Sequence, residues 1–352
     1  ARLEAVIGHG YTGGKNINQS LGTSDMFGTG VSLDGNRLAV GAWKGDGTNS
    51  SGDEGEVYLY TFTDSTFSGG SLAGIIGEGY TGGKNINQSL DNSDRFGYSV
   101  SLDGNRLAVG AYYGDGTNSS GDEGEVYLYT FTDSVFSGGE LAAMIGEGYS
   151  GGKNINQSLG NRDVFSSVSL DGNRLAVGAR WADGKNDSRR TSGEIYLYTF
   201  TDSVFSGGAL AGNIGYGYTG GKNINLSLDT GDNFGSGVSL DGNQLAVGCF
   251  ACDGYNNSRN LSGEVFLFNF TDSAFNGGEL DARIGHGYSG GNNVNLTLDV
   301  GDELGWGVAL DDNRFAAAAF RGHGKNNGRT DSGEVYLYSA EPSSDSISSA
   351  LF

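Results

Sequence analysis

Residues 102–110 read Leu-Asp-Gly-Asn-Arg-Leu-Ala-Val-Gly, and this stretch is one of five close copies in the chain. The aspartates that mark the copies lie 68 to 70 residues apart: Asp34, Asp103, Asp171, Asp241 and Asp311. Such regular spacing indicates a tandem repeat. The repeat overrides the expectation, from a length of 352 residues, of two or three separate domains.

The stretch itself predicts a β-hairpin, because Gly104 and Asn105 tolerate the positive φ angles of a tight turn. Working outward, the hairpin strands are expected near 96–102 and 106–111, and two more strand-like runs follow at 125–131 and 141–146. Four antiparallel strands in each repeat are typical of a propeller blade. The sequence therefore predicts an all-β fold, a five-bladed β-propeller.

The strand count also predicts how the propeller closes. Fourth-strand runs occur at 3–8, 72–77, 141–146, 210–215 and 280–285, so the first of them precedes every other strand. The fifth repeat ends at Tyr338 without a fourth strand of its own. We expect the N-terminal strand to complete the last blade and to protect its edge. The propeller would span 1–340, and the Ser-rich residues 341–352 would form a tail or linker.

Composition limits the classes of partner and location. A net charge of −21 disfavours nucleic acid and anionic membranes as partners. No apolar run reaches the roughly 20 residues that a membrane-spanning helix needs, so membrane insertion is not expected. The chain begins at Ala1 rather than at Met, which fits a processed segment of a secreted protein. We expect an extracellular or cell-surface location.

Within each repeat, Phe-Gly at the first strand and Gly-Ala at the second resemble the FG-GAP repeat, the blade unit of integrin α-chain propellers. The matching pairs include Phe27-Gly28, Phe96-Gly97 and Phe234-Gly235, with Gly41-Ala42, Gly110-Ala111 and Gly178-Ala179. The resemblance implies a β-propeller that acts in extracellular adhesion. Integrin propellers have seven blades and this sequence supports five, so integrin-like partners do not follow. The family's DxDxDG calcium loop is also absent.

The two long loops of each repeat, between strands two and three and between strand four and the next repeat, are predicted on one face. Long polar loops on a rigid scaffold are the usual place for binding. Each repeat there carries a tyrosine, namely Tyr11, Tyr80, Tyr149, Tyr218 and Tyr288. An asparagine follows five residues later, at Asn16, Asn85, Asn154, Asn223 and Asn293. The tyrosines either stack on sugar rings while the asparagines bond sugar hydroxyls, or they plug each loop against its own blade.

Carboxylates offer weaker candidate sites. A calcium ion could be held between strands two and three by Asp46 and Asp53, or by Asp115 and Asp122. Another aspartate precedes each first strand, at Asp25, Asp94, Asp163, Asp232 and Asp302. These aspartates either help to hold a cation or accept backbone N–H bonds in the turn. The pair Cys249 and Cys252 occurs in one repeat only and is interpreted as incidental substitution.

No nucleophile elbow, P-loop or zinc motif occurs, and the acids repeat around the fold, whereas an active site usually breaks symmetry. We therefore expect no enzyme. The favoured function is an extracellular binding or adhesion module with a glycan or a cell-surface protein as partner, in which repeated sites give multivalent recognition. A structural spacer or assembly unit that self-associates is the alternative. A glycan-active enzyme is the third class.

Overall fold

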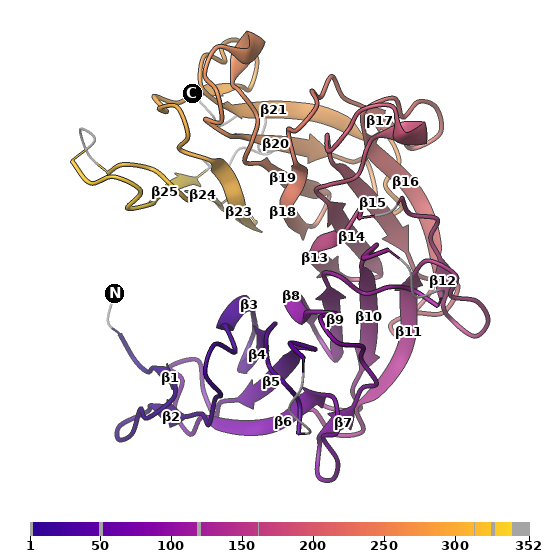
Figure 1. Ribbon diagram of the computed structural model, residues 1–352, viewed down its shortest axis with the longest axis vertical. Coiled ribbons are helices and arrows are strands. Elements are labelled where there is room, and N and C mark those ends of the chain that lie inside the picture. Colours follow the sequence, from indigo (N-terminus) through magenta and orange to yellow (C-terminus); the bar gives the residue numbers. More distant parts are fainter. Residues whose placement is uncertain are drawn as a thin grey trace. The chain divides into compact units, whose positions relative to one another are not determined.

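The computed structural model is all-β, and each of the five repeats forms one blade sheet of a five-bladed β-propeller (Figure 1). The structure describes residues 3–48, 52–117, 121–160, 162–312, 314–324 and 328–339. The chain divides into two compact units, Ala1–Phe165 with Thr201–Gly208, and Ser166–Phe200 with Ala209–Phe352. The first unit contains the first two blades and the second contains the other three.

In the first unit, each blade is a sheet of five strands. Four strands follow one another antiparallel in chain order, and a two-residue fifth strand pairs parallel to the fourth. A separate two-stranded parallel sheet precedes the blades. The strands are β1 (Ile7–Gly8), β2 (Ile17–Asn18), β3 (Phe27–Asp34), β4 (Arg37–Ala42), β5 (Glu56–Thr61), β6 (Ser71–Gly77), β7 (Ile86–Asn87), β8 (Phe96–Asp103), β9 (Arg106–Ala111), β10 (Glu125–Thr130), β11 (Glu140–Gly146) and β12 (Ile155–Asn156).

The second unit has two blades of five strands and a last blade of three. Two short 3-10 turns, η1 (Lys185–Asp187) and η2 (Tyr255–Asn257), lie in the loops between the second and third strands. Among the described residues, no helix is long and apolar enough to cross a membrane. The strands are β13 (Phe165–Asp171), β14 (Arg174–Ala179), β15 (Glu194–Thr199), β16 (Ala209–Gly215), β17 (Ile224–Asn225), β18 (Phe234–Asp241), β19 (Gln244–Cys249), β20 (Glu264–Asn269), β21 (Glu279–Gly285), β22 (Val294–Asn295), β23 (Leu304–Asp311), β24 (Arg314–Ala319) and β25 (Glu334–Ser339).

The predicted hairpin is present in each blade. In β8 and β9, Asp103 pairs with Arg106, and Gly104 between them has a φ of 55°. That angle is in the left-handed region, which glycine adopts without the strain that a Cβ atom would cause. The Arg106 guanidinium also forms an ion pair with Asp103. The turn chemistry therefore fixes the register of the first two strands, as the sequence indicated.

The short fifth strand was not predicted, and it has a local cause. After β6, Gly82 and Gly83 both have positive φ and turn the chain back along the blade. The side-chain oxygen of Asn85 then accepts a 2.9 Å hydrogen bond from the backbone N–H of Ile75. Ile86 pairs with Ile76, and the same arrangement recurs in the other complete blades. The four predicted strands therefore become five in each complete blade.

The last blade departs from this pattern, because β25 lies at the edge of a three-stranded sheet. Val335 and Leu337 on β25 are 65% and 79% exposed, whereas their counterparts Val265 and Leu267 in the preceding blade are 0% and 6% exposed. Burial differs because the counterparts are covered on both sides of their strand. In the described residues, the N-terminal segment pairs only through β1 with β2. The predicted tail, residues 341–352, lies outside the described residues.

Candidate functional site: the polar pocket of blade four

The five predicted tyrosines lie at the ends of the fourth strands, where most of them bond to a buried glutamate. The hydroxyl of Tyr149 donates to Glu125 Oε1 at 2.6 Å, and that of Tyr288 donates to Glu264 Oε2 at 2.7 Å. Similar bonds join the partners in two more blades: Tyr80 with Glu56, and Tyr218 with Glu194. Tyr11 precedes the first complete blade and is half-exposed.

This arrangement is the one that the plug alternative describes. Each tyrosine ring lies against the glycine that ends its own fourth strand; a Cβ at Gly146, for example, would come within 3.1 Å of the Tyr149 ring. Burial of the glutamates raises the pKa of the Glu125 and Glu264 carboxyls, while the tyrosine hydrogen bonds oppose the shift. The hydroxyls therefore have an internal structural role, and their role in binding stays a prediction.

The five predicted asparagines also hold the blade together. The side-chain oxygen of each accepts a hydrogen bond from the backbone of the preceding strand, for example 2.8 Å from Arg283 N to Asn293 Oδ1. The other four bonds run from Val6 to Asn16, Ile75 to Asn85, Met144 to Asn154, and Asn213 to Asn223. The structure thus places each asparagine beside its tyrosine's loop, with its acceptor already engaged.

The predicted calcium ligands are joined in pairs through the backbone. Asp46 Oδ1 accepts a 3.1 Å bond from Asp53 N, and Asp115 Oδ1 accepts a 2.9 Å bond from Asp122 N. Asp53 also forms a 3.1 Å ion pair with Lys44. The structure therefore brings the two members of each pair together, but engages them in local contacts. A calcium ion at these loops stays a prediction.

The aspartates before the first strands all accept backbone bonds in the turn, as the second alternative for them describes. Asp94 Oδ2, for instance, accepts a 2.8 Å bond from Asp91 N. The bonds in the other repeats are made by Asp25, Asp163, Asp232 and Asp302. Burial raises the pKa of the Asp94 carboxyl to about 8 and that of Asp232 to about 7.

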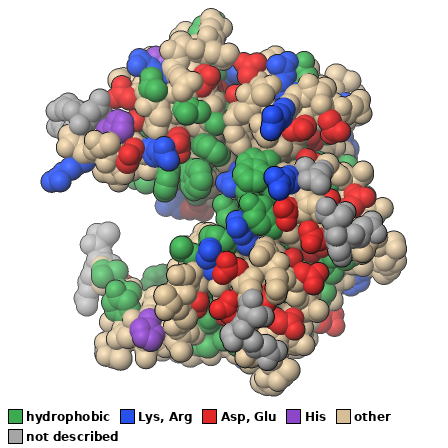
Figure 2. Space-filling model, viewed as in Figure 1, with side chains coloured by type: hydrophobic (Ala, Val, Ile, Leu, Met, Phe, Trp, Pro, Cys, Tyr) green, Lys and Arg blue, Asp and Glu red, His purple; other side chains and the backbone are tan. Residues whose placement is uncertain are grey.

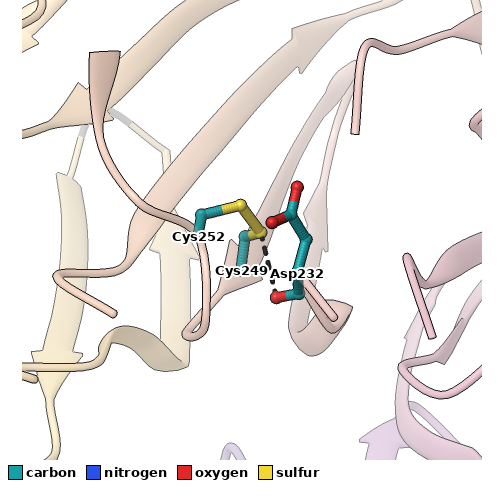
Figure 3. A group of neighbouring side chains, drawn as sticks. All are labelled: Asp232, Cys249 and Cys252. Atoms are coloured by element: carbon teal, nitrogen blue, oxygen red, sulfur yellow. Dashed lines mark hydrogen bonds between the residues drawn. A yellow bond between two sulfur atoms is a disulfide. The ribbon is translucent and has the colours of Figure 1, made fainter. Parts of the chain in front are cut away.

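The two cysteines, interpreted from sequence as incidental, form a disulfide in the structure (Figure 3). A turn after β19, in which Cys252 N donates to Cys249 O at 3.1 Å, brings their Cα atoms to 5.5 Å. Cys249 Sγ lies 3.3 Å from the backbone oxygen of Asp232. Among the described residues, Asp232 and these two cysteines are the one group with metal-ligand spacing. Because the sulfurs are bonded to each other, the group is a crosslink.

Beside the disulfide, blade four contains a polar pocket of about 640 Å³. Its walls come from the loop before β18, the loop after β19, the start of β20, and β21 with its following loop. We call it the blade-four pocket. Its lining includes two of the predicted residues, Tyr288 and Asn293. Blade four is therefore one place where the predicted face forms a defined cavity.

Acidic groups dominate the blade-four pocket. Asp229, Asp232, Asp253 and Glu264 all line it, against one arginine, Arg283. Burial is the main cause of the raised pKa of Asp232, and the charges of Glu264 and Asp229 add to it. Arg283 Nη1 lies 4.0 Å from Glu264 Oε2 and donates to the Tyr288 hydroxyl at 3.1 Å. The pocket thus presents hydrogen-bond acceptors in a largely negative setting.

An aromatic ring stands at the edge of this pocket. Tyr255, the first residue of η2, is 52% exposed, and its ring lies edge-on to Tyr288 with centroids 5.7 Å apart. The neighbouring Asn257 Nδ2 donates to Asp229 Oδ2 at 2.8 Å. Blade three forms the same 3-10 turn at η1, but with Lys185 in place of Tyr255 and Asn213 in place of Arg283. Blade four therefore breaks the symmetry of the repeats.

Sequence reasoning missed Tyr255 and Arg283 because it looked for residues that repeat. A search for positions at which a single repeat differs from the other four could have found them. Tyr255, Arg283 and the cysteine pair are all of this kind.

Comparison with known families agrees with this architecture. Residues 21–60 and 90–129 match the FG-GAP repeat, and each match runs from the loop before the first strand of a blade to its third strand. These two segments, in the first two blades, therefore match the FG-GAP repeat. No curated protein sequence matches it. An FG-GAP propeller is a binding or structural repeat domain, which confirms the coarse prediction from the sequence.

The glycines of the FG-GAP repeats have a physical role at the contact between blades. A Cβ atom added to Gly41 of blade one would lie 1.8 Å from the backbone oxygen of Gly97 in blade two. The same approach recurs in the second unit between Gly248 and Gly305. Only glycine allows these strands of adjacent blades, β4 with β8 and β19 with β23, to come so close. These glycines therefore let adjacent blades pack tightly.

Proposed function

We propose that this protein is a non-enzymatic binding module, outside the cell or at its surface, that holds a glycan in the blade-four pocket. The observation that carries the proposal is the exposed ring of Tyr255 at the edge of a pocket rich in carboxylate and amide oxygens. A sugar presents hydroxyl donors together with an apolar ring face, and the pocket offers a matching partner for each. The matches to the FG-GAP repeat support the proposed location, because such repeats occur in extracellular proteins.

The proposal places binding in one blade rather than equally in five. Tyr149 and Tyr288 use their hydroxyls on buried glutamates, and Asn293 uses its oxygen on the backbone. Asp253 is engaged through Oδ1 with Leu261 N at 2.7 Å. A carboxylate oxygen has room for more than one hydrogen bond, so these acids can hold their loops and still accept from a ligand.

A glycan array tests this function. The intact chain should bind a defined set of neutral or amino sugars, and Tyr255→Ala should weaken that binding about tenfold, the usual size of a lost stacking contact. Lys185→Ala is the matched control, because it truncates the equivalent position of the same turn in blade three. Loss of binding in both variants, or in neither, would contradict a site at blade four. If no glycan binds the parent chain, the spacer function takes its place.

We further propose that residues 3–8 complete the last blade as its fourth strand. Two observations support this pairing, one in each unit. In the second unit, β25 is an edge strand with exposed apolar side chains. In the first unit, β1 pairs with β2 in the same register in which the fourth strand β6 pairs with β7. In the complete blades, the first valine or isoleucine of the third strand faces the isoleucine near the end of the fourth, as Val265 faces Ile284. By that rule Val335 would face Ile7. Self-association through the same edge is the alternative.

Calcium is proposed only for the loops between strands two and three in the first two blades. Its support is the 2.9 Å bond that holds Asp122 close to Asp115, because nearby carboxylates lower the cost of assembling a calcium site. Thermal melts with calcium and with a chelator should differ by a few degrees. Asp115→Asn together with Asp122→Asn should remove the difference, and identical melts of the parent chain would dismiss the proposal.

A further inference from the structure

All three tryptophans of the chain lie beside an arginine. The guanidinium carbon of Arg95 is 4.6 Å from the ring centroid of Trp43. That of Arg180 is 5.5 Å from Trp181 and 5.6 Å from Trp306. The chain has only three tryptophans in 352 residues, and each of them thus lies next to an arginine. The repeated pairing, with each tryptophan in or just after the first or second strand of a blade, points to a specific feature rather than to general core packing.

In the second unit, three blades contribute to one such group, which we call the Trp306 platform: Arg180, Phe250, Trp306 and Phe320. Arg180, Phe250 and Phe320 each directly follow the second strand of a blade, and Trp306 lies in β23. The Trp306 and Phe320 rings are stacked, with centroids 5.0 Å apart and planes 23° apart. The centroid of the Phe250 ring lies 4.9 Å from that of Trp306, with the two planes tilted by 57°.

The platform is open to solvent, unlike most aromatic groups of the fold. Trp306 is 37% exposed and Phe320 is 54% exposed. Figure 2 shows hydrophobic side chains gathered, with Lys and Arg side chains next to them, over the region that Figure 1 labels β14, β18 and β23. An exposed aromatic surface of this kind marks an interaction site more often than a defect of packing.

We propose that the Trp306 platform binds an acidic sugar, one hexuronate unit within an otherwise neutral glycan. Flat, exposed rings match the apolar face of a pyranose. The Arg180 guanidinium beside them, with its fork of N–H donors, matches a carboxylate. No bond is made or broken, so the step is binding alone.

The net charge of −21 favours one acidic unit over a polyanion. A densely charged polymer, nucleic acid included, would be repelled by the rest of the surface, whereas a single carboxylate close to Arg180 gains its local attraction at little long-range cost. The blade-four pocket, in contrast, is lined by four acids and would repel a carboxylate. This inference therefore goes beyond the proposed function. It concerns different residues, and its ligand carries a carboxylate that the blade-four pocket would repel.

Tryptophan fluorescence gives a direct test, because an exposed indole responds to a sugar stacked on it. The probe is a neutral oligosaccharide that ends in one hexuronate, compared with the same molecule methyl-esterified at that carboxylate. The parent chain should bind the acid about tenfold more tightly than the ester, the size expected for one charge-assisted hydrogen bond. Arg180→Gln should remove that difference, and Trp306→Leu should abolish binding of both.

Arg95→Gln is the matched control, because it changes the arginine beside Trp43 in the first unit and leaves the platform intact. Tyr255→Ala should also leave acid binding unchanged, so failure of this inference and failure of the blade-four proposal are separable. Equal affinity for acid and ester, or unchanged binding by a folded Trp306→Leu variant, would overturn the proposal. Binding of a single-stranded oligonucleotide in preference to both sugars would overturn it as well.

Discussion

The hydroxyl of Tyr288 donates a 2.7 Å hydrogen bond to Oε2 of Glu264, whose side chain is buried at the start of β20. The two residues are 24 positions apart, and the same pair recurs as Tyr149 with Glu125. The bond ties the loop after the fourth strand to the third strand of its own blade. The repeated tyrosine is therefore a loop anchor and not a free ring.

Removing this hydroxyl should destabilise the fold. Tyr149→Phe and Tyr288→Phe each leave a buried carboxylate without one of its donors, which costs about 1–3 kcal/mol in the free energy of unfolding. Tyr11→Phe is the control, because Tyr11 is half-exposed. Denaturant unfolding measures all three. If the Tyr149 and Tyr288 variants prove as stable as the parent while glycan binding falls, the tyrosines act on a ligand after all.

Stability should decrease as pH rises from about 4 to about 8. Burial raises the pKa of Asp94 to about 8 in the folded chain, against 3.8 for an ordinary aspartate. Between these values the folded state binds more protons than the unfolded state, so the free energy of unfolding falls with increasing pH. Asp94→Asn should flatten this dependence and should be most stabilising, relative to the parent, above pH 8.

Asp64, whose pKa is lowered rather than raised, provides the control. Hydrogen bonds from Thr66 and Ser68 lower the pKa of the exposed Asp64 to about 2. Its contribution to the free energy of unfolding is complete above about pH 4 and is lost as pH falls through about 2. Asp64→Asn should therefore alter the dependence of stability on pH only at its acidic end. Melts from pH 2 to 9 distinguish the two. A parent chain whose stability rises steadily from pH 4 to 8 would contradict the role given to Asp94.

Deleting residues 1–8 should lower the melting temperature strongly and promote aggregation, because the edge of β25 would then lack the strand proposed to cover it. A sharper test places one cysteine on each edge, Ile7→Cys with Val335→Cys. Oxidation should crosslink the two within one chain. A crosslink between two chains would instead favour self-association, and an unchanged melting temperature after the deletion would show that residues 3–8 do not complete the blade.

The disulfide should contribute modestly to stability. It closes a loop with a sequence separation of 3, and closure of so short a loop is worth about 2 kcal/mol. Dithiothreitol should therefore lower the melting temperature of the parent by a few degrees. The variant Cys249→Ala with Cys252→Gly, which copies Ala42 and Gly45 of blade one, should not respond to the reductant. A parent chain equally insensitive to it would indicate that the pair is not oxidised.

The sequence alone determined the repeat, its period and the four long strands of a blade, but not the short fifth strand. These features depend on neighbouring residues: Gly104 allows the tight turn, and the short, mostly apolar run at 125–131 predicts a strand wherever the blade lies. The glycines that let blades approach closely, such as Gly41 and Gly97, belong to the repeated pattern as well.

Only the tertiary structure decided what the polar and aromatic side chains do. Tyr288 is an anchor because folding buries Glu264 beside it, and Cys249 is a crosslink because a turn brings Cys252 to it. Arg180 and Trp306 lie far apart in sequence and come from different blades. A side chain's role depends on its burial and its partners, and long-range packing sets both; the local pattern of a repeat sets neither.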